Sequence, residues 1–257
     1  MTYHAYHLHL SQEMVQGVRV ALIPGAPERC SEIADFFGES HQIAYNREYR
    51  SVISESREGK ILVVSSGIGG PSLAIAMEEL VRLGIRYFLR VGTCGAIAAD
   101  LNPVDLVVSE GAVRLDGTSG HYAPLPYPAC ADTEVTTLIV RACRELGFPY
   151  RAGITCSSAT FYPGQERYDT FTGYVIRELQ GSLDEWRRLG VLNYEMETAT
   201  LFTMARVFGM RAGAVCAVLV NRLTSEEPDH ATYKEAESRV SRAAVQTAKL
   251  ILKELIW

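Results

Sequence analysis

The chain has 257 residues, of which 47% are hydrophobic and 21% charged, and its formal net charge is -5. This is the composition of a soluble globular protein, and the length suffices for a buried core in one large domain or two small ones. The negative charge argues against a protein that binds nucleic acid through a broad basic surface, although a few buried arginines could still hold a small anion.

The sequence shows none of the usual signals for export or membrane insertion. It contains no run of about 18 uncharged apolar residues, which a transmembrane helix would need. The start, Met1–His4, lacks the basic and apolar regions of a signal peptide. The six cysteines are scattered without a C-x-x-C pair, which is typical of buried free thiols in a reducing compartment. We therefore expect a cytoplasmic protein.

Strands and helices alternate along the first part of the chain. Val18–Ile23 is predicted to form a strand that ends in the turn sequence Pro24–Arg29. Pro71 suits the first turn of a helix with a periodic apolar face. The elements predicted here are strand 18–23, a short helix ending at Phe37, strands 41–45, 49–54 and 60–65, and a helix over 71–81.

The stretch Phe88–Ile97 is the one around which the predicted site is built. Its apolar run ends in the Gly-x-x-Gly spacing of Gly92 and Gly95, which predicts a buried strand opening into a loop. Glycines let the main chain approach an anion closely, while Arg90 would add a guanidinium fork and Thr93 a hydroxyl donor. The competing interpretation is a tight turn with Arg90 in a structural salt bridge.

The second half of the chain continues the alternation. It predicts an α/β fold, a single domain with a central mixed or mostly parallel β-sheet flanked by helices. The predicted elements are strand 105–108, a loop-rich stretch to Cys130, helix 133–146, strand 150–155, a mobile insertion 165–189, strand 191–194, helix 197–208, strand 211–220 and helix 233–256.

Polar residues follow three of these strands. Arg29 comes after the first strand and Arg90 lies in the central one, and two arginines from different strand ends could clamp a phosphate. Glu195 and Glu197 are two residues apart, so in extended backbone both carboxylates could meet sugar hydroxyls. A solvated turn with a charge at a helix N-terminus remains the alternative. A glycosidase pair is less consistent, because its carboxylates flank the bond from opposite sides.

Four motifs together resemble the hexameric nucleoside phosphorylases. Gly25–Arg29, Arg90–Gly95 and Asn193–Glu197 are similar to that family, and Ser157–Asp169 resembles its uridine phosphorylase branch. The resemblance covers nearly the whole chain, so residues 1–257 are expected to form one nucleoside phosphorylase domain. One departure is Ala26, which stands where the family usually has Asp in the first loop.

The resemblance implies a site in three parts, with catalytic roles for Arg90, Glu197 and Arg167. It also implies that two side chains come from a neighbouring subunit, although by themselves they would be taken for a terminal histidine and a surface charge. Phosphate would be held by Gly25, Arg29, Arg90, Thr93 and the neighbour's Arg47; ribose by Thr93, Met196, Glu197 and the neighbour's His7; and the base by Phe161, Gln165 and Arg167.

The implied assembly is a hexamer, a trimer of dimers with shared sites. Similar enzymes hold a monovalent cation between subunits, and the matching residues here are Glu48, Ile68 and Ser72. A structural potassium ion is therefore expected as a possible component. No organic cofactor is implied, and inorganic phosphate is the co-substrate.

The implied reaction is the reversible phosphorolysis of uridine to uracil and ribose 1-phosphate. A purine nucleoside phosphorylase would place an Asp where this chain has Asn221 and Arg222, because an acid there can bond to the purine. A nucleosidase that uses water would not need Arg29 and Arg90. A storage protein of the same fold would not need those arginines or Glu197. Neither nucleic acid nor a membrane is expected as a partner.

Overall fold

The computed structural model describes residues 3–255, and its sheet is organised around the ten-residue strand β5 (Tyr87–Ala96). β5 pairs in parallel with β1 (Val20–Pro24) on one edge and with β10 (Arg211–Asn221) on the other. Most residues of all three strands are buried, as expected for parallel strands covered on both faces.

The remaining strands extend this sheet in two ways. Beyond β10 the pairing passes through β6, β8 and β9 and returns to β5, which closes a ring of five strands. Beyond β1 it continues through β4, β3 and β2 as an open sheet. Parallel and antiparallel pairs both occur, so the predicted mixed sheet is confirmed. The bounds are β2 Glu39–Asn46, β3 Tyr49–Ser56, β4 Gly59–Val64, β6 Leu106–Leu115, β8 Tyr150–Ser158 and β9 Val191–Glu195; the short β7, Ala129–Cys130, pairs with β6.

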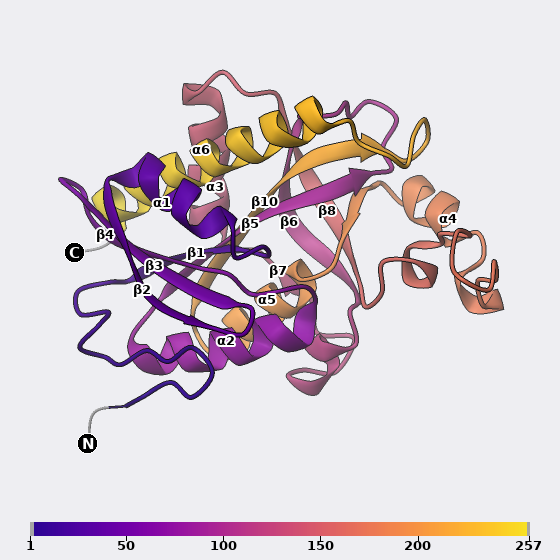
Figure 1. The fold of residues 1–257 in the computed structure, drawn as a ribbon. Helices are drawn as coiled ribbons and strands as arrows, with labels where there is room; N and C mark the ends of the chain where they lie inside the picture. The colour runs from indigo at the N-terminus through magenta and orange to yellow at the C-terminus, as the bar shows by residue number, and fades with distance from the viewer. Residues whose placement is uncertain (1–2, 256–257) are drawn as a thin grey trace.

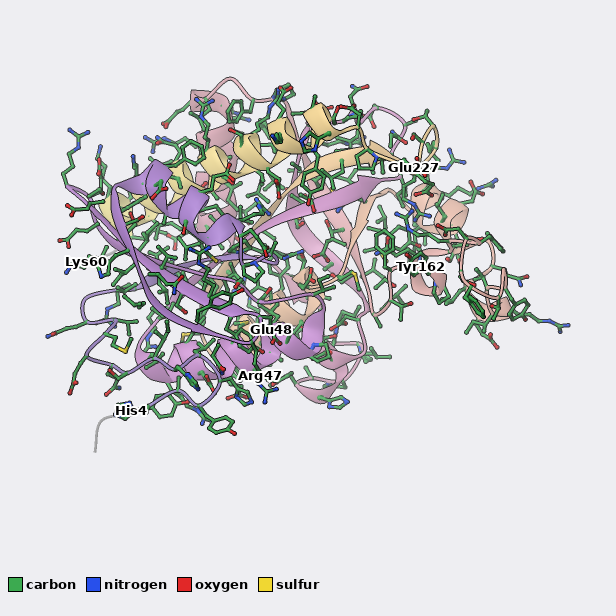
Figure 2. All side chains as sticks on the ribbon, in the orientation of Figure 1. His4, Arg47, Glu48, Lys60, Tyr162 and Glu227 are labelled. Carbon is green, nitrogen blue, oxygen red and sulfur yellow. The ribbon has the colours of Figure 1, made fainter. Side chains whose placement is uncertain are left out.

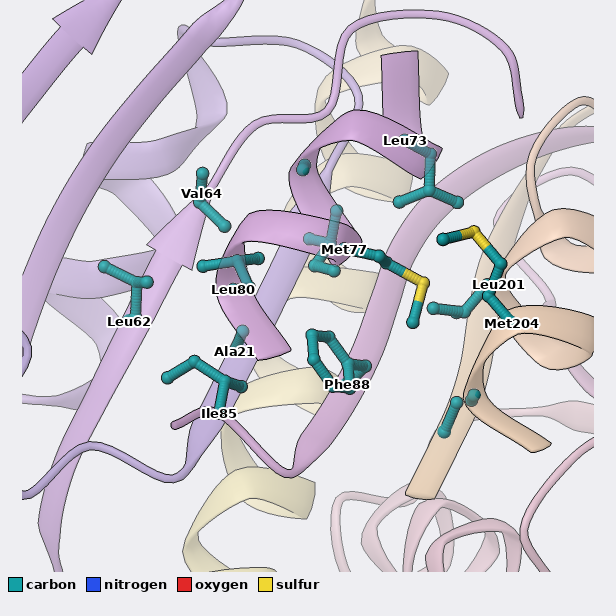
Figure 3. Packing of buried hydrophobic residues seen from close by; sticks show 14 of the residues in the cluster. Ala21, Leu62, Val64, Leu73, Met77, Leu80, Ile85, Phe88, Leu201 and Met204 are labelled. Atoms are coloured by element: carbon teal, nitrogen blue, oxygen red, sulfur yellow. The ribbon is translucent and has the colours of Figure 1, made fainter. Parts of the chain in front are cut away.

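Helices cover both faces of the sheet (Figure 1). α1, α3 and α6 share one hydrophobic cluster with the strands, whereas α2 and α5 share another on the opposite face. In the second cluster, Met77 and Leu80 of α2 pack near Phe88 of β5 (Figure 3). The bounds are α1 Arg29–Phe37, α2 Gly70–Leu83, α3 Thr133–Glu145, α5 Thr198–Val207 and α6 His230–Glu254.

Local capping chemistry sets the ends of these helices. Gly84 ends α2 in the left-handed conformation, with φ of 104°. Asp229 caps α6 by accepting a hydrogen bond from the Thr232 N–H at 2.9 Å. α6 therefore begins at His230, earlier than the predicted Tyr233, and the predicted final residue, Ile256, lies outside the described residues. No helix within residues 3–255 is long and apolar enough to cross a membrane.

The prediction that Gly92–Gly95 form a loop is wrong. β5 runs through them to Ala96, and they stay paired with β10. A Cβ on Gly92 would lie 2.6 Å from the Cys216 Sγ, and one on Gly95 would lie 2.9 Å from the Arg222 Cδ. Both glycines are therefore needed for the close approach of a neighbouring side chain, and not for a turn.

Other element boundaries also differ from the prediction. β6 continues to Leu115 instead of ending at Val108, because a bulge between Ser109 and Gly111 lets the strand stay paired with β8. The insertion 165–189, for which no secondary structure was predicted, contains short helices, including α4 (Ser182–Arg188). Of the six free cysteines, Cys130 is exposed, contrary to the prediction, and the others are buried as predicted.

Candidate active site

The candidate site lies where one edge of β5 changes partners. β1 pairs with β5 only as far as Val91, and β9 pairs with it only at Gly95 and Ala96. Between these pairings, residues 92–94 face a cavity of about 500 Å³. The turn after β1 and the residues after β9 form part of its wall. This is the expected place for a ligand, beyond the carboxyl ends of the parallel strands.

Arg29 stands at one end of the cavity, at the start of α1. Its guanidinium is buried, and its Nη1 donates to the Val91 carbonyl at 2.9 Å. Its Nε lies 3.3 Å from the Glu237 carboxylate, which reaches in from α6. Burial lowers the pKa of Arg29, and the Glu237 carboxylate opposes that shift. Arg29 thus remains a cation that is tied to both β5 and α6.

Arg90 lies at the same end and is held by two carboxylates. Its Nε donates to Glu195 at 2.9 Å, and its Nη2 is paired with Glu197. Burial alone would lower the pKa of Arg90, but the two carboxylates outweigh it, so the pKa is raised. Its Nη1 is buried and has no hydrogen-bond partner among the described residues. A buried donor of this kind is costly unless a ligand accepts from it.

Glu195 is saturated by the protein itself. Its side chain is only 1% exposed, and besides Arg90 it accepts from the Ser157 hydroxyl and from the backbone N–H groups of Glu197 and Thr198. It therefore caps α5 and orients Arg90. The prediction that both carboxylates meet sugar hydroxyls is wrong for Glu195, because its acceptor positions are already used.

Glu197 is placed differently from Glu195. Its carboxylate bridges Arg90 and the N–H of Gly69, at 2.5 Å from the latter, at the N-terminus of α2. Burial raises the pKa of Glu197, although the Arg90 charge opposes this. Met196, next to it, also lines the cavity.

The far end contains the predicted base-binding residues. Phe161, Gln165 and Arg167 all line the cavity, and the Arg167 Cζ lies 4.2 Å from the centre of the Phe161 ring. Glu166 has a positive φ of 53°, which turns the chain so that both of its neighbours are buried. Its carboxylate accepts from the Leu183 N–H at 2.6 Å, which fixes the turn against α4.

Two residues at this end were not predicted to belong to the site. Arg222, just after β10, donates through Nε to Glu226 at 2.9 Å and through Nη1 to the Gln165 carbonyl at 2.8 Å. Glu226 also pairs with Arg167. On a helix, an Arg and a Glu four residues apart are expected to form an ion pair. The segment after β10 is not helical, so the spacing of Arg222 and Glu226 did not predict their contact.

Asn221 is used structurally. Its amide donates to the carbonyls of Ala98 and Leu101 at 2.9 and 2.8 Å and so holds the turn after β5. A purine nucleoside phosphorylase was expected to have an Asp at this place in the sequence. In this chain the buried Asn221 amide occupies it.

The structure divides the predicted site residues into two groups. Gly25, Arg29, Arg90, Thr93, Phe161, Gln165, Arg167, Met196 and Glu197 all line the one cavity. His7 and Arg47 do not. His7 bonds to Glu79 at 2.9 Å beside a second, larger cavity of about 830 Å³, and Arg47 is exposed in the β2–β3 turn (Figure 2). That second cavity lacks converging arginines, so we place the chemistry in the first.

The predicted cation residues lie near one another. The Ser72 hydroxyl donates to the Glu48 carboxylate at 2.8 Å, and a Cβ on Gly67, next to Ile68, would lie 2.8 Å from the Glu48 side chain. Ile68 itself is largely exposed. Carboxylate and hydroxyl oxygens suit a hard cation, so these residues are chemically consistent with the expectation.

Comparison with known proteins identifies the family. The family described as the phosphorylase superfamily matches residues 19–256. The chain belongs to this superfamily. It is 47% identical over 247 residues to the uridine phosphorylase of Escherichia coli (strain K12), a match that covers 96% of this chain and 98% of the relative.

Two further relatives carry the names of two different activities. The uridine phosphorylase of Haemophilus influenzae is 44% identical over 247 residues, covering 96% of this chain and 98% of its own. The guanosine phosphorylase of Halorubrum lacusprofundi is 38% identical over 240 residues, covering 91% and 93%. The predicted family and its α/β fold are therefore confirmed.

Proposed function

We propose that this member of the phosphorylase superfamily catalyses the reversible phosphorolysis of uridine to uracil and ribose 1-phosphate. The observation that carries the proposal is the paired-arginine end of the cavity, where Arg90, beside Arg29, keeps one buried guanidinium nitrogen that has no partner within residues 3–255. The far end supplies amide and guanidinium groups for a base. Relatives that match over 96% of the chain are named uridine phosphorylases.

Phosphate would bind between Arg29 and Arg90, with the Thr93 hydroxyl and the backbone at Gly25 as further donors. This end of the cavity carries two arginines against the carboxylates of Glu195, Glu197 and Glu237. The local charge is therefore negative, which is unfavourable for binding a phosphate dianion, so one more cation is needed. That deficit supports a contribution of Arg47 from a neighbouring subunit.

Cleavage would proceed by attack of the bound phosphate on the sugar. Breaking the glycosidic bond develops positive charge on the ribose and negative charge on the departing base, and the phosphate supplies both nucleophile and counter-charge. Glu197 and Met196 would hold the ribose between the two ends, and His7 of a neighbouring subunit would close over its 5′ end. No covalent intermediate with the protein is required.

The base end matches the edge of uracil. Gln165 can accept from the ring N–H and donate to one carbonyl, while Arg167 donates to the other. Cytosine would present an amino group to the arginine, which costs about 1–3 kcal/mol or more. A purine is also disfavoured, because the end of β10 offers the committed Asn221 amide and not an acid.

The proposed assembly is a hexamer of single-domain chains, each domain spanning residues 1–257, acting in the cytoplasm. His7 and Arg47 lie away from the cavity of their own chain, which is consistent with use at a neighbour's site. A potassium ion held by Glu48, Ile68 and Ser72 would need further oxygens from a second copy.

The test is a phosphorolysis assay with a panel of nucleosides, with and without phosphate. Uridine should yield uracil and ribose 1-phosphate only when phosphate is present, and cytidine, inosine and guanosine should be nearly inert. Base release without phosphate would instead indicate a nucleosidase. Efficient cleavage of inosine or guanosine would indicate a purine enzyme.

Shared sites can be tested by mixing two weakened chains. Arg47→Ala and Arg90→Lys should each be poor, but mixed oligomers should recover activity, because some sites then contain both native groups. If activity does not recover after verified subunit exchange, Arg47 acts within its own chain or not at all.

A further inference from the structure

One carboxylate joins two buried guanidiniums at the base end of the cavity. Glu226 accepts from the Arg222 Nε at 2.9 and 3.2 Å and is paired with the Arg167 Nη1. Arg167 and Arg222 are only 7% and 8% exposed, whereas the Glu226 side chain is 45% exposed and lines the cavity. Within residues 3–255 no other carboxylate forms a salt bridge with either arginine.

The position of Arg167 depends on this contact. Its Nη1 is engaged by Glu226, and its Nε is buried without a hydrogen-bond partner in the described part of the chain. Its Nη2 forms no hydrogen bond within residues 3–255 and lies near Gly95, 3.8 Å from the place that a Cβ there would occupy. Gly95 lines the cavity, so Nη2 is left to donate to a base bound there.

Arg222 extends the same network to the second base-reading residue. Its Nη1 donates to the Gln165 backbone carbonyl at 2.8 Å. One chain of contacts therefore runs from Gln165 through Arg222 and Glu226 to Arg167. The backbone of Gln165 and the guanidinium of Arg167 are thus linked through a single carboxylate.

A surface salt bridge with a half-exposed carboxylate usually contributes little to the stability of a protein. This case differs because the partners are two buried like charges. Burial lowers the pKa of Arg167 and the neighbouring Arg222 lowers it further, while Glu226 opposes both. Without the carboxylate, the two guanidiniums would repel each other in a desolvated position.

We propose that Glu226 is a positioning residue for base recognition. It holds Arg167 by Nη1 so that Nη2 faces the base, and it holds Arg222 so that the Gln165 turn keeps its place. The inference rests on the proposed function and deepens it. It also ties base recognition to the segment between β10 and α6, which supplies both Arg222 and Glu226 to this network.

The matched experiment compares Glu226→Gln with Glu227→Gln. Both remove one negative charge from the same segment, but the Glu227 side chain is exposed and forms no hydrogen bond or salt bridge within residues 3–255. Glu226→Gln should lower kcat/KM for uridine about 10- to 100-fold, the loss expected for a charge-assisted hydrogen bond. The KM for phosphate should stay unchanged, and the preference for uridine over cytidine should shrink. Glu227→Gln should behave like the native enzyme.

A double-mutant cycle with Arg167→Ala separates positioning from general stability. Adding Glu226→Gln to Arg167→Ala should lower uridine turnover much less than it does in the native background, because the residue to be positioned is already gone. Glu226→Asp should restore part of the activity, and it replaces Glu226→Gln in the cycle if that variant folds poorly.

Two results would overturn the proposal. One is a Glu226→Gln enzyme that is as active on uridine as Glu227→Gln. The other is a Glu226→Gln enzyme whose KM values for uridine and for phosphate rise equally, and whose loss of activity adds fully to the loss caused by Arg167→Ala. If the native protein does not cleave uridine at all, the proposed function itself is wrong, and the assay of the native protein shows this without any variant.

Discussion

The two ends of the cavity use the same chemical pair, arginine with glutamate, in two different constructions. At the phosphate end, Glu195 and Glu197 are almost fully buried and are also bonded to backbone N–H groups at the starts of α5 and α2. At the base end, Glu226 is half exposed and sits on a segment outside the sheet. Arg90 belongs to β5 itself, whereas Arg167 lies in a turn after β8.

The difference shows which end the fold makes rigid. A buried pair that also caps two helices cannot be moved without disturbing the sheet and both helices. A pair held by one half-exposed carboxylate can shift when its own segment shifts. We infer that the anion position is fixed by the core and that the base position is adjusted by the segments after β8 and β10. The following predictions test that contrast, beginning with the largest effect.

Replacing Arg90 should have the largest effect. In Arg90→Lys the single ammonium cannot serve Glu195, Glu197 and an anion at once, since it lacks the planar fork. Activity should fall about 10²- to 10³-fold, with a raised KM for phosphate. Steady-state kinetics with varied phosphate measures this, with the melting temperature as the control for folding. A native phosphate KM in this variant would contradict the assignment of the phosphate end.

A pair of glycine substitutions should separate the two ends. Gly92→Ala places a Cβ 3.2 Å from the Arg90 Cζ, and Gly95→Ala places one 2.9 Å from the Arg222 Cδ. Each should lower kcat/KM about 10- to 100-fold through displacement of its own arginine. Gly92→Ala should raise the KM for phosphate, and Gly95→Ala the KM for uridine. Identical kinetic defects in the two variants would show that the ends are not independent.

The Gly92 result requires one control, because the same Cβ would lie 2.6 Å from the Cys216 Sγ. Combining Gly92→Ala with Cys216→Ala relieves that contact and leaves the approach to Arg90. If the phosphate defect disappears in the double variant, it arose from the sulfur contact and not from Arg90.

Removing the ring under Arg167 should have a smaller effect. Phe161 is half exposed, and its ring faces the Arg167 guanidinium at 4.2 Å. Phe161→Leu loses a cation–π contact of about 0.5–1 kcal/mol, so the KM for uridine should rise about two- to fivefold. Phe161→Tyr keeps the ring and serves as the control. A change in the KM for phosphate in either variant would be unexpected.

The smallest expected effect is a pH dependence of stability at the phosphate end. Burial raises the pKa of Glu237, and Arg29 opposes this, with Glu32 and Tyr233 as the other ionisable groups nearby. A carboxyl with a raised folded-state pKa contributes stability below its unfolded pKa of about 4.3, and loses it as the pH rises through the folded value. The native melting temperature should therefore fall relative to Glu237→Gln as the pH rises above about 4.

Melting curves of both proteins between about pH 4 and 7 measure this difference. Glu235→Gln, an exposed position on the same helix, is the control. A difference that grows in the opposite direction would mean that the Arg29 contact, and not burial, dominates the titration of Glu237.

Much of the architecture follows from local sequence. The alternation of apolar strands with amphipathic helices predicted the α/β fold, because burial of one face leaves a period of two or 3.6 residues in the sequence. Arg29 and Arg90 could be paired in advance since ligands gather beyond the carboxyl ends of parallel strands. The roles implied for Gln165 and Arg167 came from a resemblance, and no periodicity in the sequence indicated them.

Tertiary structure alone decided what surrounds these residues. Gly92 and Gly95 were expected to form a loop, but they lie within β5, because pairing with β10 continues through them. They are glycines because a Cβ would meet Cys216 at one position and Arg222 at the other. Glu226 is distant from Arg167 in sequence and carries no local signal, since an ion pair between two non-helical segments depends on where the fold brings them. The sequence determined which groups are available, and the packing of the sheet determined which of them meet.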